Sequence, residues 1–339
     1  MSSIVAWTVW IFLALVLAGI IYQSAGARAD AARIPPPGRL IDVGRGRLHV
    51  HEQGSGRPVV IFEAGISASS LSWGRVAPQV AGFAKACCYD RSGLAWSDRT
   101  HAPVSARSLA AELDVLLSAA AIDTPVVIVA HSFGTFVARA FAHDFRQKTA
   151  GIVLVDPIYP AEFLKMSAAE RRRLQGGVFL SRVGAALASV GVVRWCLNRL
   201  LSGSTGAPRR ISRFFGSEAA SLMSRLVRQV QKLPQESWPA MRAHWSRPKS
   251  FLAMADHLSS LPRSAAEIEA TGPLGDLPLV VITAGSQPPV VRAEHARIAA
   301  LSTRGSHVIA EGAGHWILID QPEIVVKAIQ ELGNWGTGN

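Results

Sequence analysis

One serine stands where a nucleophile could be built. Ser132 lies in the middle of the five-residue sequence AHSFG (residues 130–134), directly after the apolar run Val126–Val129. When a buried strand turns sharply into a helix, the side chain at the turn points outward, and small residues are needed two positions on either side. Ala130 and Gly134 hold those positions, and Ala130 is one methyl group larger than the usual glycine. We therefore expect Ser132 to be a catalytic nucleophile.

A serine hydroxyl needs a base within hydrogen-bond reach. Of the ten histidines, His315 has the best context, because it follows a short strand pattern and lies in the glycine-rich sequence GAGHW before the last helical segment. A serine early and a histidine late in the chain fit a known order of such catalytic groups. His131 belongs to the turn itself, where we expect a packing role, and His307 begins a strand and is a weaker candidate.

Short β-branched runs alternate with helical patterns through most of the chain, which predicts an α/β fold with a mostly parallel sheet flanked by helices. A hairpin is expected before the first buried strand, and a helix is expected around residues 73–83. The predicted strands are residues 39–43, 47–52, 59–62, 86–89, 126–129, 151–155, 279–283 and 308–310.

The alternation stops between residues 158 and 275, which predicts an inserted helical cap over a core formed by residues 39–157 and 276–334. Residues 157–275 contain 17 Lys and Arg against 7 Asp and Glu, a net of +10 out of +11 for the whole chain. Within the cap, residues 178–201 mix apolar side chains with Arg182, Arg194 and Arg199. This stretch either packs over the sheet or forms a surface that meets anionic lipid headgroups. No nucleic-acid-binding motif accompanies the charge, so we expect no nucleic-acid partner.

The N-terminus is the most apolar part of the chain. Residues 4–22 carry no charge, and at 1.5 Å per residue they span about 28 Å, close to the thickness of a bilayer core. We expect residues 1–27 to form a membrane anchor, followed by a proline-rich linker at residues 28–38. A cleaved signal peptide is the alternative, because Ala25-Gly26-Ala27 resembles a cleavage site. Arginines follow the span and none precedes it, which favours a cytoplasmic catalytic domain, or an exported one if the segment is cleaved.

Taken together, three motifs resemble those of serine hydrolases with the α/β-hydrolase fold, over about residue 39 to the last helix. They are AHSFG at residues 130–134, YDRSG with WSD at residues 89–98, and GAGH with DQP at residues 312–322. The resemblance implies that the backbone N–H groups of Phe133 and Ile66 form an oxyanion hole, which stabilises the negative oxygen of the tetrahedral intermediate. The second motif we interpret as a structural turn.

The resemblance leaves the carboxylate of the triad open. Most relatives carry it after the seventh strand, where this chain has no carboxylate before Glu294. Asp156, at the end of the sixth strand, occupies the other position that the fold uses, and we favour it. Asp156 could instead cap the turn before Pro157, and Glu294 could be a solvated helix residue.

These observations predict a membrane-tethered hydrolase that cleaves an ester or related acyl substrate, with no metal, organic cofactor or obligate protein partner. A serine nucleophile argues against haloalkane dehalogenase or epoxide hydrolase chemistry, which uses a carboxylate nucleophile on this fold. Thioester, amide, lactone and carbon–carbon bond cleavage remain open, because the same groups serve them. The alternative is a catalytically silent protein of this fold that binds a ligand or partner.

Overall fold

A computed structural model describes residues 2–201 and 232–333. Within these ranges, eight strands form one sheet in the order β1-β2-β4-β3-β5-β6-β7-β8. Strands β3 to β8 run parallel, whereas β2 is antiparallel to both β1 and β4, so the sheet is mostly parallel as the sequence predicts. The strands are β1 (Arg39–Asp42), β2 (Arg47–Gln53), β3 (Val59–Glu63), β4 (Lys85–Tyr89), β5 (Val126–His131), β6 (Thr149–Val155), β7 (Leu279–Ala284) and β8 (Gly305–Ala310).

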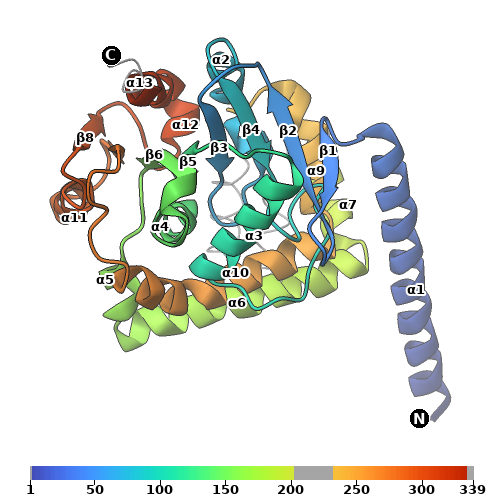
Figure 1. Cartoon of the computed structure of the whole chain (residues 1–339). Helices are drawn as coiled ribbons and strands as arrows, with labels where there is room; N and C mark the ends of the chain where they lie inside the picture. The colour runs from blue at the N-terminus through green and yellow to red at the C-terminus, as the bar shows by residue number, and fades with distance from the viewer. Residues whose placement is uncertain (1, 202–231, 334–339) are drawn as a thin grey trace.

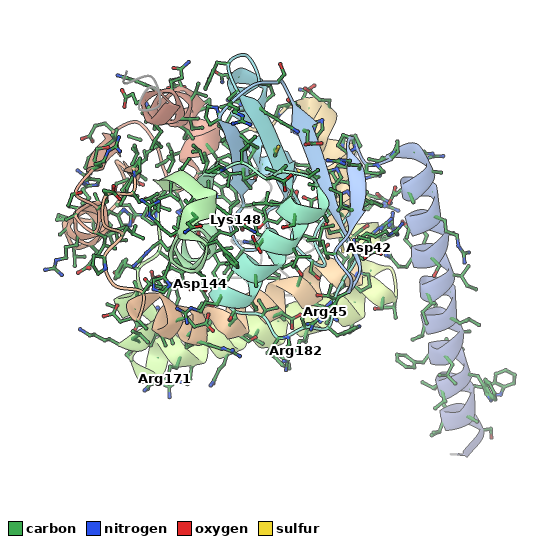
Figure 2. The ribbon with its side chains drawn as sticks, in the orientation of Figure 1. Asp42, Arg45, Asp144, Lys148, Arg171 and Arg182 are labelled. Atoms are coloured by element: carbon green, nitrogen blue, oxygen red, sulfur yellow. The ribbon has the colours of Figure 1, made fainter. Side chains whose placement is uncertain are left out.

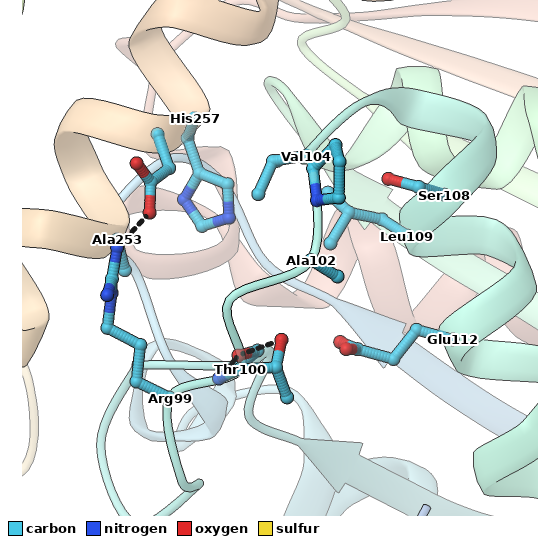
Figure 3. A pocket seen from close by; sticks show the side chains of 12 residues that line it. Arg99, Thr100, Ala102, Val104, Ser108, Leu109, Glu112, Ala253 and His257 are labelled. Atoms are coloured by element: carbon cyan, nitrogen blue, oxygen red, sulfur yellow. Dashed lines mark hydrogen bonds and ion pairs between the residues drawn. The ribbon is translucent and has the colours of Figure 1, made fainter. Parts of the chain in front are cut away.

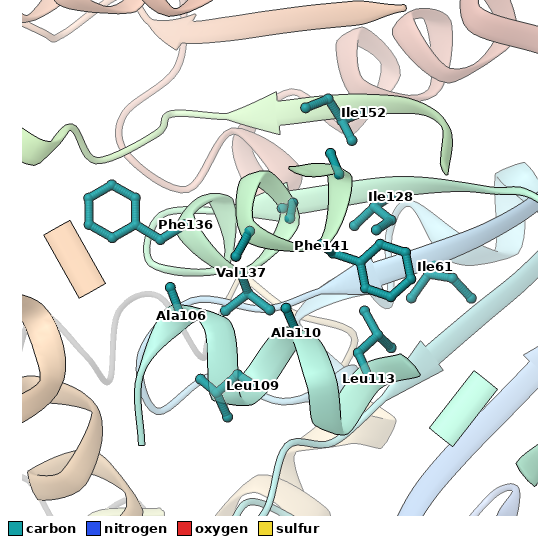
Figure 4. Packing of buried hydrophobic residues seen from close by; sticks show 14 of the residues in the cluster. Ile61, Ala106, Leu109, Ala110, Leu113, Ile128, Phe136, Val137, Phe141 and Ile152 are labelled. Atoms are coloured by element: carbon teal, nitrogen blue, oxygen red, sulfur yellow. The ribbon is translucent and has the colours of Figure 1, made fainter. Parts of the chain in front are cut away.

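The central strands are apolar along almost their whole length because both faces of the sheet are covered. Successive side chains of a strand point to opposite faces. Ile61, Ile128 and Ile152 therefore meet in one hydrophobic cluster, which Figure 4 shows beneath helices α3 (Ala106–Ala119) and α4 (Gly134–Asp144). Val60 and Val127 belong to a second cluster on the other face.

Helices cover both faces of the sheet. Helix α4 packs on β5 and β6, and helices α2 (Ala77–Val80) and α13 (Pro322–Gly333) pack on the opposite face. The helix expected around residues 73–83 is wrong: the chain forms only the 3-10 turn η1 (Ser70–Trp73) and the single-turn α2 there. The remaining core elements are η2 (Arg146–Lys148), α11 (Pro289–Ala299) and α12 (Ile317–Asp320).

In its described part, the insertion after β6 consists of helices joined by short loops, and residues 202–231 lie outside the described residues. Helices α6 and α10 lie side by side across the edge of the sheet where β6 ends (Figure 1). The backbone N–H of Ala106 donates to Ser264 Oγ at 3.0 Å, which ties α10 to the first turn of α3. The insertion contains α5 (Pro160–Leu164), α6 (Ala168–Ser189), α7 (Val192–Leu201), η3 (Gln235–Ser237), α9 (Trp238–Trp245) and α10 (Pro248–Glu269).

Helix α1 (Ser2–Arg33) is longer than the expected anchor. By length and composition it could cross a membrane, and its most apolar window, of mean hydropathy 2.6, has none of its residues buried in the protein. The helix continues through residues 28–33, which were expected to begin the linker, so only residues 34–38 separate it from β1. The physical reason is packing, because the last turns of α1 contact the cap.

A buried polar network makes that contact. Arg194 of α7 forms an ion pair with Asp30, and its Nε donates to Gln23 Oε1 at 2.9 Å. The Gln23 amide in turn donates to the backbone carbonyl of Ser246 at 3.0 Å. All three side chains of the network are more than nine-tenths buried.

Candidate active site

Ser132 sits on a strained turn between β5 and α4. Its φ angle is +53°, a left-handed conformation that costs a residue other than glycine energy and that clusters at functional sites. The backbone N–H of Ser132 donates to Val155 O at 3.1 Å, which fixes the turn to the end of β6. A Cβ atom at Gly134 would lie 2.7 Å from Ala64 O, so only glycine allows α4 to approach β3 this closely. Ala130 is fully buried in the sheet, where its methyl group fits.

Asp156 lies at the same edge of the sheet, directly after β6. It too has a positive φ, +42°, and its backbone N–H donates to Ile282 O at 2.7 Å. Its carboxylate is buried and accepts three hydrogen bonds: from the Ala284 N–H at 3.0 Å, from Gln287 Nε2 at 2.6 Å and from His315 Nδ1 at 2.6 Å. Burial alone would raise the pKa of this carboxyl, but the three hydrogen bonds outweigh burial and lower its pKa. Asp156 therefore stays ionised at neutral pH.

His315 follows β8 and meets Asp156 across β7. Its Nδ1 faces the carboxylate, and its side chain is 42% exposed. Its ring packs against that of His131, with centroids 4.6 Å apart and the ring planes tilted by 45°. The ring thus lies over the turn that carries Ser132. Among the described residues, no hydrogen bond links Ser132 Oγ to His315. Such catalytic hydrogen bonds often tighten only when substrate binds.

The two backbone groups expected to form an oxyanion hole lie on either side of the turn. In the described part of the chain, neither the Phe133 nor the Ile66 N–H donates to another protein group. The two segments are close, because a Cβ atom at Gly65 would lie 3.3 Å from Ser132 Cβ. Backbone donors without an internal acceptor beside a serine are available to a negatively charged oxygen.

Arg91 is a residue whose role the sequence did not reveal. Its guanidinium is buried, pairs with Glu63, and donates to the backbone carbonyls of Ala64 (2.8 Å) and Gly65, the two residues before Ile66. It also lies 5.3 Å from the centroid of the Phe133 ring. Arg91 thus contacts both segments that are expected to supply the oxyanion donors. The only sequence signal was its place in the YDRSG motif, interpreted as a structural turn.

His131 packs as expected but also makes a specific contact. Its Nε2 lies 2.9 Å from the backbone carbonyl of His315, so this nitrogen carries the hydrogen and donates. Burial is the main reason why the pKa of His131 falls to about 3, and the ring therefore stays neutral. Its Nδ1 would lie 3.1 Å from a Cβ atom at Gly65. His131 thereby supports both the oxyanion segment and the loop that carries His315.

The structure places the other candidates away from this cluster. Glu294 lies on α11 and forms an ion pair with Arg297 at 2.7 Å, with no contact to His315. His307 and His295 both contact the hydroxyl of Thr283, at 2.7 and 2.8 Å, within the core behind Asp156.

Two hollows flank the site. One begins at the oxyanion segment and is lined by Ser67, Ser69, Leu71 and Leu94 together with Met241 of α9. The other lies between α3, the loop of residues 99–104 and α10 (Figure 3). The buried ring of His257 lines this second hollow, and its centroid lies 5.5 Å from that of the Phe133 ring.

Comparison with known proteins agrees with the observed fold. A family model described as "Alpha/beta hydrolase family" matches residues 59–328. The chain belongs to the alpha/beta hydrolase family. The structure of this α/β-hydrolase is similar to that of an ancestral haloalkane dehalogenase (TM-score 0.65, 19% identity, 88% of this chain and 100% of the other). It is also similar to an esterase from Thermogutta terrifontis (TM-score 0.58, 19% identity, 86% and 96%). At these identities the likeness concerns the fold alone.

Curated relatives share part of the sequence. The uncharacterized protein YqjL of Bacillus subtilis is 32% identical over 107 residues, which cover 32% of this chain and 42% of YqjL. A haloalkane dehalogenase of Sphingobium indicum is 27% identical over 163 residues, covering 43% of this chain and 55% of the dehalogenase. The α/β-hydrolase therefore spans about half of the length of these relatives.

Proposed function

We propose that this α/β-hydrolase is a membrane-tethered serine hydrolase that cleaves an ester or related acyl substrate through Ser132, His315 and Asp156. The observation that carries the proposal is the 2.6 Å hydrogen bond between His315 and Asp156, formed beside the strained turn of Ser132. A serine, an imidazole and an ionised carboxylate on neighbouring strand ends are the parts that acyl transfer requires.

The reaction has two steps, which are formation of an acyl-enzyme and its hydrolysis by water. Ser132 Oγ attacks the substrate carbonyl carbon while His315 Nε2 takes the hydroxyl proton, and Asp156 stabilises the resulting imidazolium through Nδ1. The tetrahedral oxyanion accepts hydrogen bonds from the Phe133 and Ile66 N–H groups. His315 then returns the proton to the departing alcohol, which leaves an acyl-enzyme. Water, deprotonated by His315, attacks the acyl-enzyme, and the acid is released as Ser132 regains its proton.

The hollow at the oxyanion segment favours an uncharged substrate. Leu71, Leu94, Met241 and Trp245 give it an apolar lining, and the hydroxyls of Ser67, Ser69 and Ser250 are neutral. His244 also lines it and is neutral at pH 7, because burial lowers its pKa to about 3. An acyl chain or an apolar leaving group matches this lining better than a charged group does. Among the structural neighbours, the Thermogutta protein is named an esterase.

The buried network between α1 and the cap supports an anchor that is retained. Cleavage at residues 25–27 would remove Gln23, which accepts from Arg194 Nε, and would leave Asp30, the ion-pair partner of the buried guanidinium, close to a free chain end. Loss of a hydrogen-bond partner of a buried charge is destabilising. The arginines that follow the span favour a catalytic domain on the cytoplasmic side.

A fluorophosphonate probe tests the proposed chemistry, because it reacts only with an activated serine. We expect the full-length protein to be labelled and the Ser132→Ala variant to remain unlabelled. Absence of labelling in folded wild-type protein would support the alternative, a silent protein of this fold that binds a ligand. A panel of p-nitrophenyl esters of increasing acyl length then identifies the preferred substrate class.

A further inference from the structure

Helix α6 has an outward face of unusual composition. The face that does not pack on α10 exposes Arg171, Arg172, Phe179 and Arg182, and Ala186 follows on the same side one turn later. In its 22 residues α6 has four arginines but a single glutamate. The Phe179 side chain is 64% exposed. A cationic face that also exposes a large aromatic ring matches the surface of an anionic bilayer.

The contacts between α1 and α6 determine how far this face of α6 lies from the membrane-spanning part of α1. Helix α1 contacts the end of α6, where Gly19 packs against the backbone of Val190 so closely that a Cβ atom would clash. Asn198 of α7 donates to the Tyr22 hydroxyl at 3.0 Å, three residues further along α1. N-terminal to these contacts the side chains of α1 are largely exposed.

The membrane boundary follows from these contacts. Residues 4–22 span about 28 Å, close to the roughly 30 Å of a bilayer core, so this core ends near Tyr22. That is the level at which α1 meets α6 and α7. Figure 1 shows the N-terminal half of α1 projecting past α6, and Figure 2 shows Arg171 and Arg182 on the side of α6 that faces away from the sheet, toward the same end.

Packing between α1 and the cap prevents α6 from moving independently of the anchor. The Asp30–Arg194–Gln23 network is buried, and Arg242 adds a second contact to Asp30 at 3.6 Å. The sequence suggested Arg194 as a ligand of lipid headgroups. That suggestion is wrong, because Arg194 is only 4% exposed. The exposed arginines of α6 take its place.

From this geometry we propose that the outer face of α6 lies in the membrane–water interface, where Arg171, Arg172 and Arg182 bind anionic lipid headgroups and Phe179 enters the acyl boundary. This inference rests on the membrane anchoring proposed above. It makes the cap a membrane-binding surface and fixes the height of the catalytic domain above the bilayer. Each arginine near an anionic surface strengthens binding about fivefold, so loss of three weakens it about a hundredfold.

Single-cysteine labelling of the full-length protein tests the proposal. Cys196, which is partly exposed, is replaced by serine so that it does not react with the dye. Cys87 and Cys88 are kept because they are buried. An environment-sensitive dye is then placed on Ala186→Cys of α6, on Ala14→Cys of α1 or on Ala293→Cys of α11, all exposed positions. The protein is reconstituted in vesicles of phosphatidylcholine with or without phosphatidylglycerol, each containing brominated phospholipid as a quencher.

We expect lipid quenching at positions 14 and 186 and none at position 293. Quenching at position 186 should require phosphatidylglycerol and should be lost when Arg171, Arg172 and Arg182 are replaced together by glutamine, while quenching at position 14 persists. Quenching at 14 without quenching at 186 in anionic vesicles would overturn the proposal and leave the anchor intact. Absence of quenching at position 14 would overturn both, because α1 would then not lie in the bilayer.

Discussion

Replacing Asp156 with asparagine gives the sharpest measurement on the candidate site. In the structure, Oδ1 accepts from Ala284, and Oδ2 accepts from both Gln287 and His315. Asparagine keeps one acceptor oxygen, so its amide must face either the Ala284 N–H or the two side-chain donors. Both arrangements remove the negative charge that opposes an imidazolium at His315.

The expected loss is large. In a Ser-His-Asp triad the same replacement lowers turnover about 10⁴-fold. We expect a loss of about 10³- to 10⁴-fold here, which corresponds to about 4–5 kcal/mol in the activation free energy. The rate of fluorophosphonate labelling measures this loss without knowledge of the natural substrate. Circular dichroism and the thermal midpoint show whether the variant folds.

Glu294→Gln is the matched control. Glu294 pairs with Arg297, whose side chain is 76% exposed, and such exposed pairs contribute about 0–1 kcal/mol to stability. We therefore expect unchanged labelling. Full labelling of folded Asp156→Asn, or loss of labelling in Glu294→Gln, would refute the assignment of the carboxylate.

Three further predictions concern the surroundings of the site. A lysine at position 91 cannot reach both the Ala64 and the Gly65 carbonyls. Arg91→Lys should therefore lower kcat by about 10²-fold with little change in KM, as loss of an oxyanion donor does. A rise in KM as large as the fall in kcat would contradict a positioning role for Arg91. Gly65→Ala should likewise slow turnover, because its Cβ crowds His131 and Ser132, whereas Gly176→Ala, with open space around it in α6, should leave turnover unchanged and raise the thermal midpoint slightly. Burial lowers the pKa of His244 in the folded protein to about 3. As the pH falls below 6.5, the unfolded state therefore binds a proton at this histidine while the folded state does not. The free energy of unfolding should then fall by about 1.4 kcal/mol per pH unit. Urea unfolding of His244→Phe should show a weaker pH dependence than wild type, and a variant of the exposed His143 should not.

The fold could be predicted because short stretches of adjacent residues indicate its strands and helices. Apolar runs such as Val126–Val129 can be buried only in the middle of a covered sheet, and their alternation with helical patterns fixes the parallel order. The helix expected at residues 73–83 is much shorter because Gly74 follows η1 directly and Pro78, which lacks a backbone N–H, is tolerated only in the first turn of a helix, so α2 starts at Ala77. The end of α1 was misplaced because a buried ion pair with a residue 164 positions away holds residues 28–33 helical.

The candidate site likewise contains residues that the sequence revealed and residues that it did not. Ser132 and His315 stand in motifs that can be recognised from adjacent residues, and the resemblance to the α/β-hydrolase fold, which can place its carboxylate after the sixth strand, made Asp156 a candidate. Arg91 and His131 act through backbone carbonyls of distant segments, and contacts to a backbone carbonyl leave no trace in the identity of the residue contacted. Sequence patterns therefore point to the reacting groups more readily than to the groups that hold them in place.

The continuity of α1 has a consequence for how this protein would encounter its substrate. Only residues 34–38 separate the helix from β1, and the end of the helix is itself packed into the cap. A long flexible tether would let a catalytic domain sweep a hemisphere of solution above the bilayer. A domain seated on its own anchor instead searches in two dimensions, by lateral diffusion, and meets the molecules that travel along the membrane surface at one height.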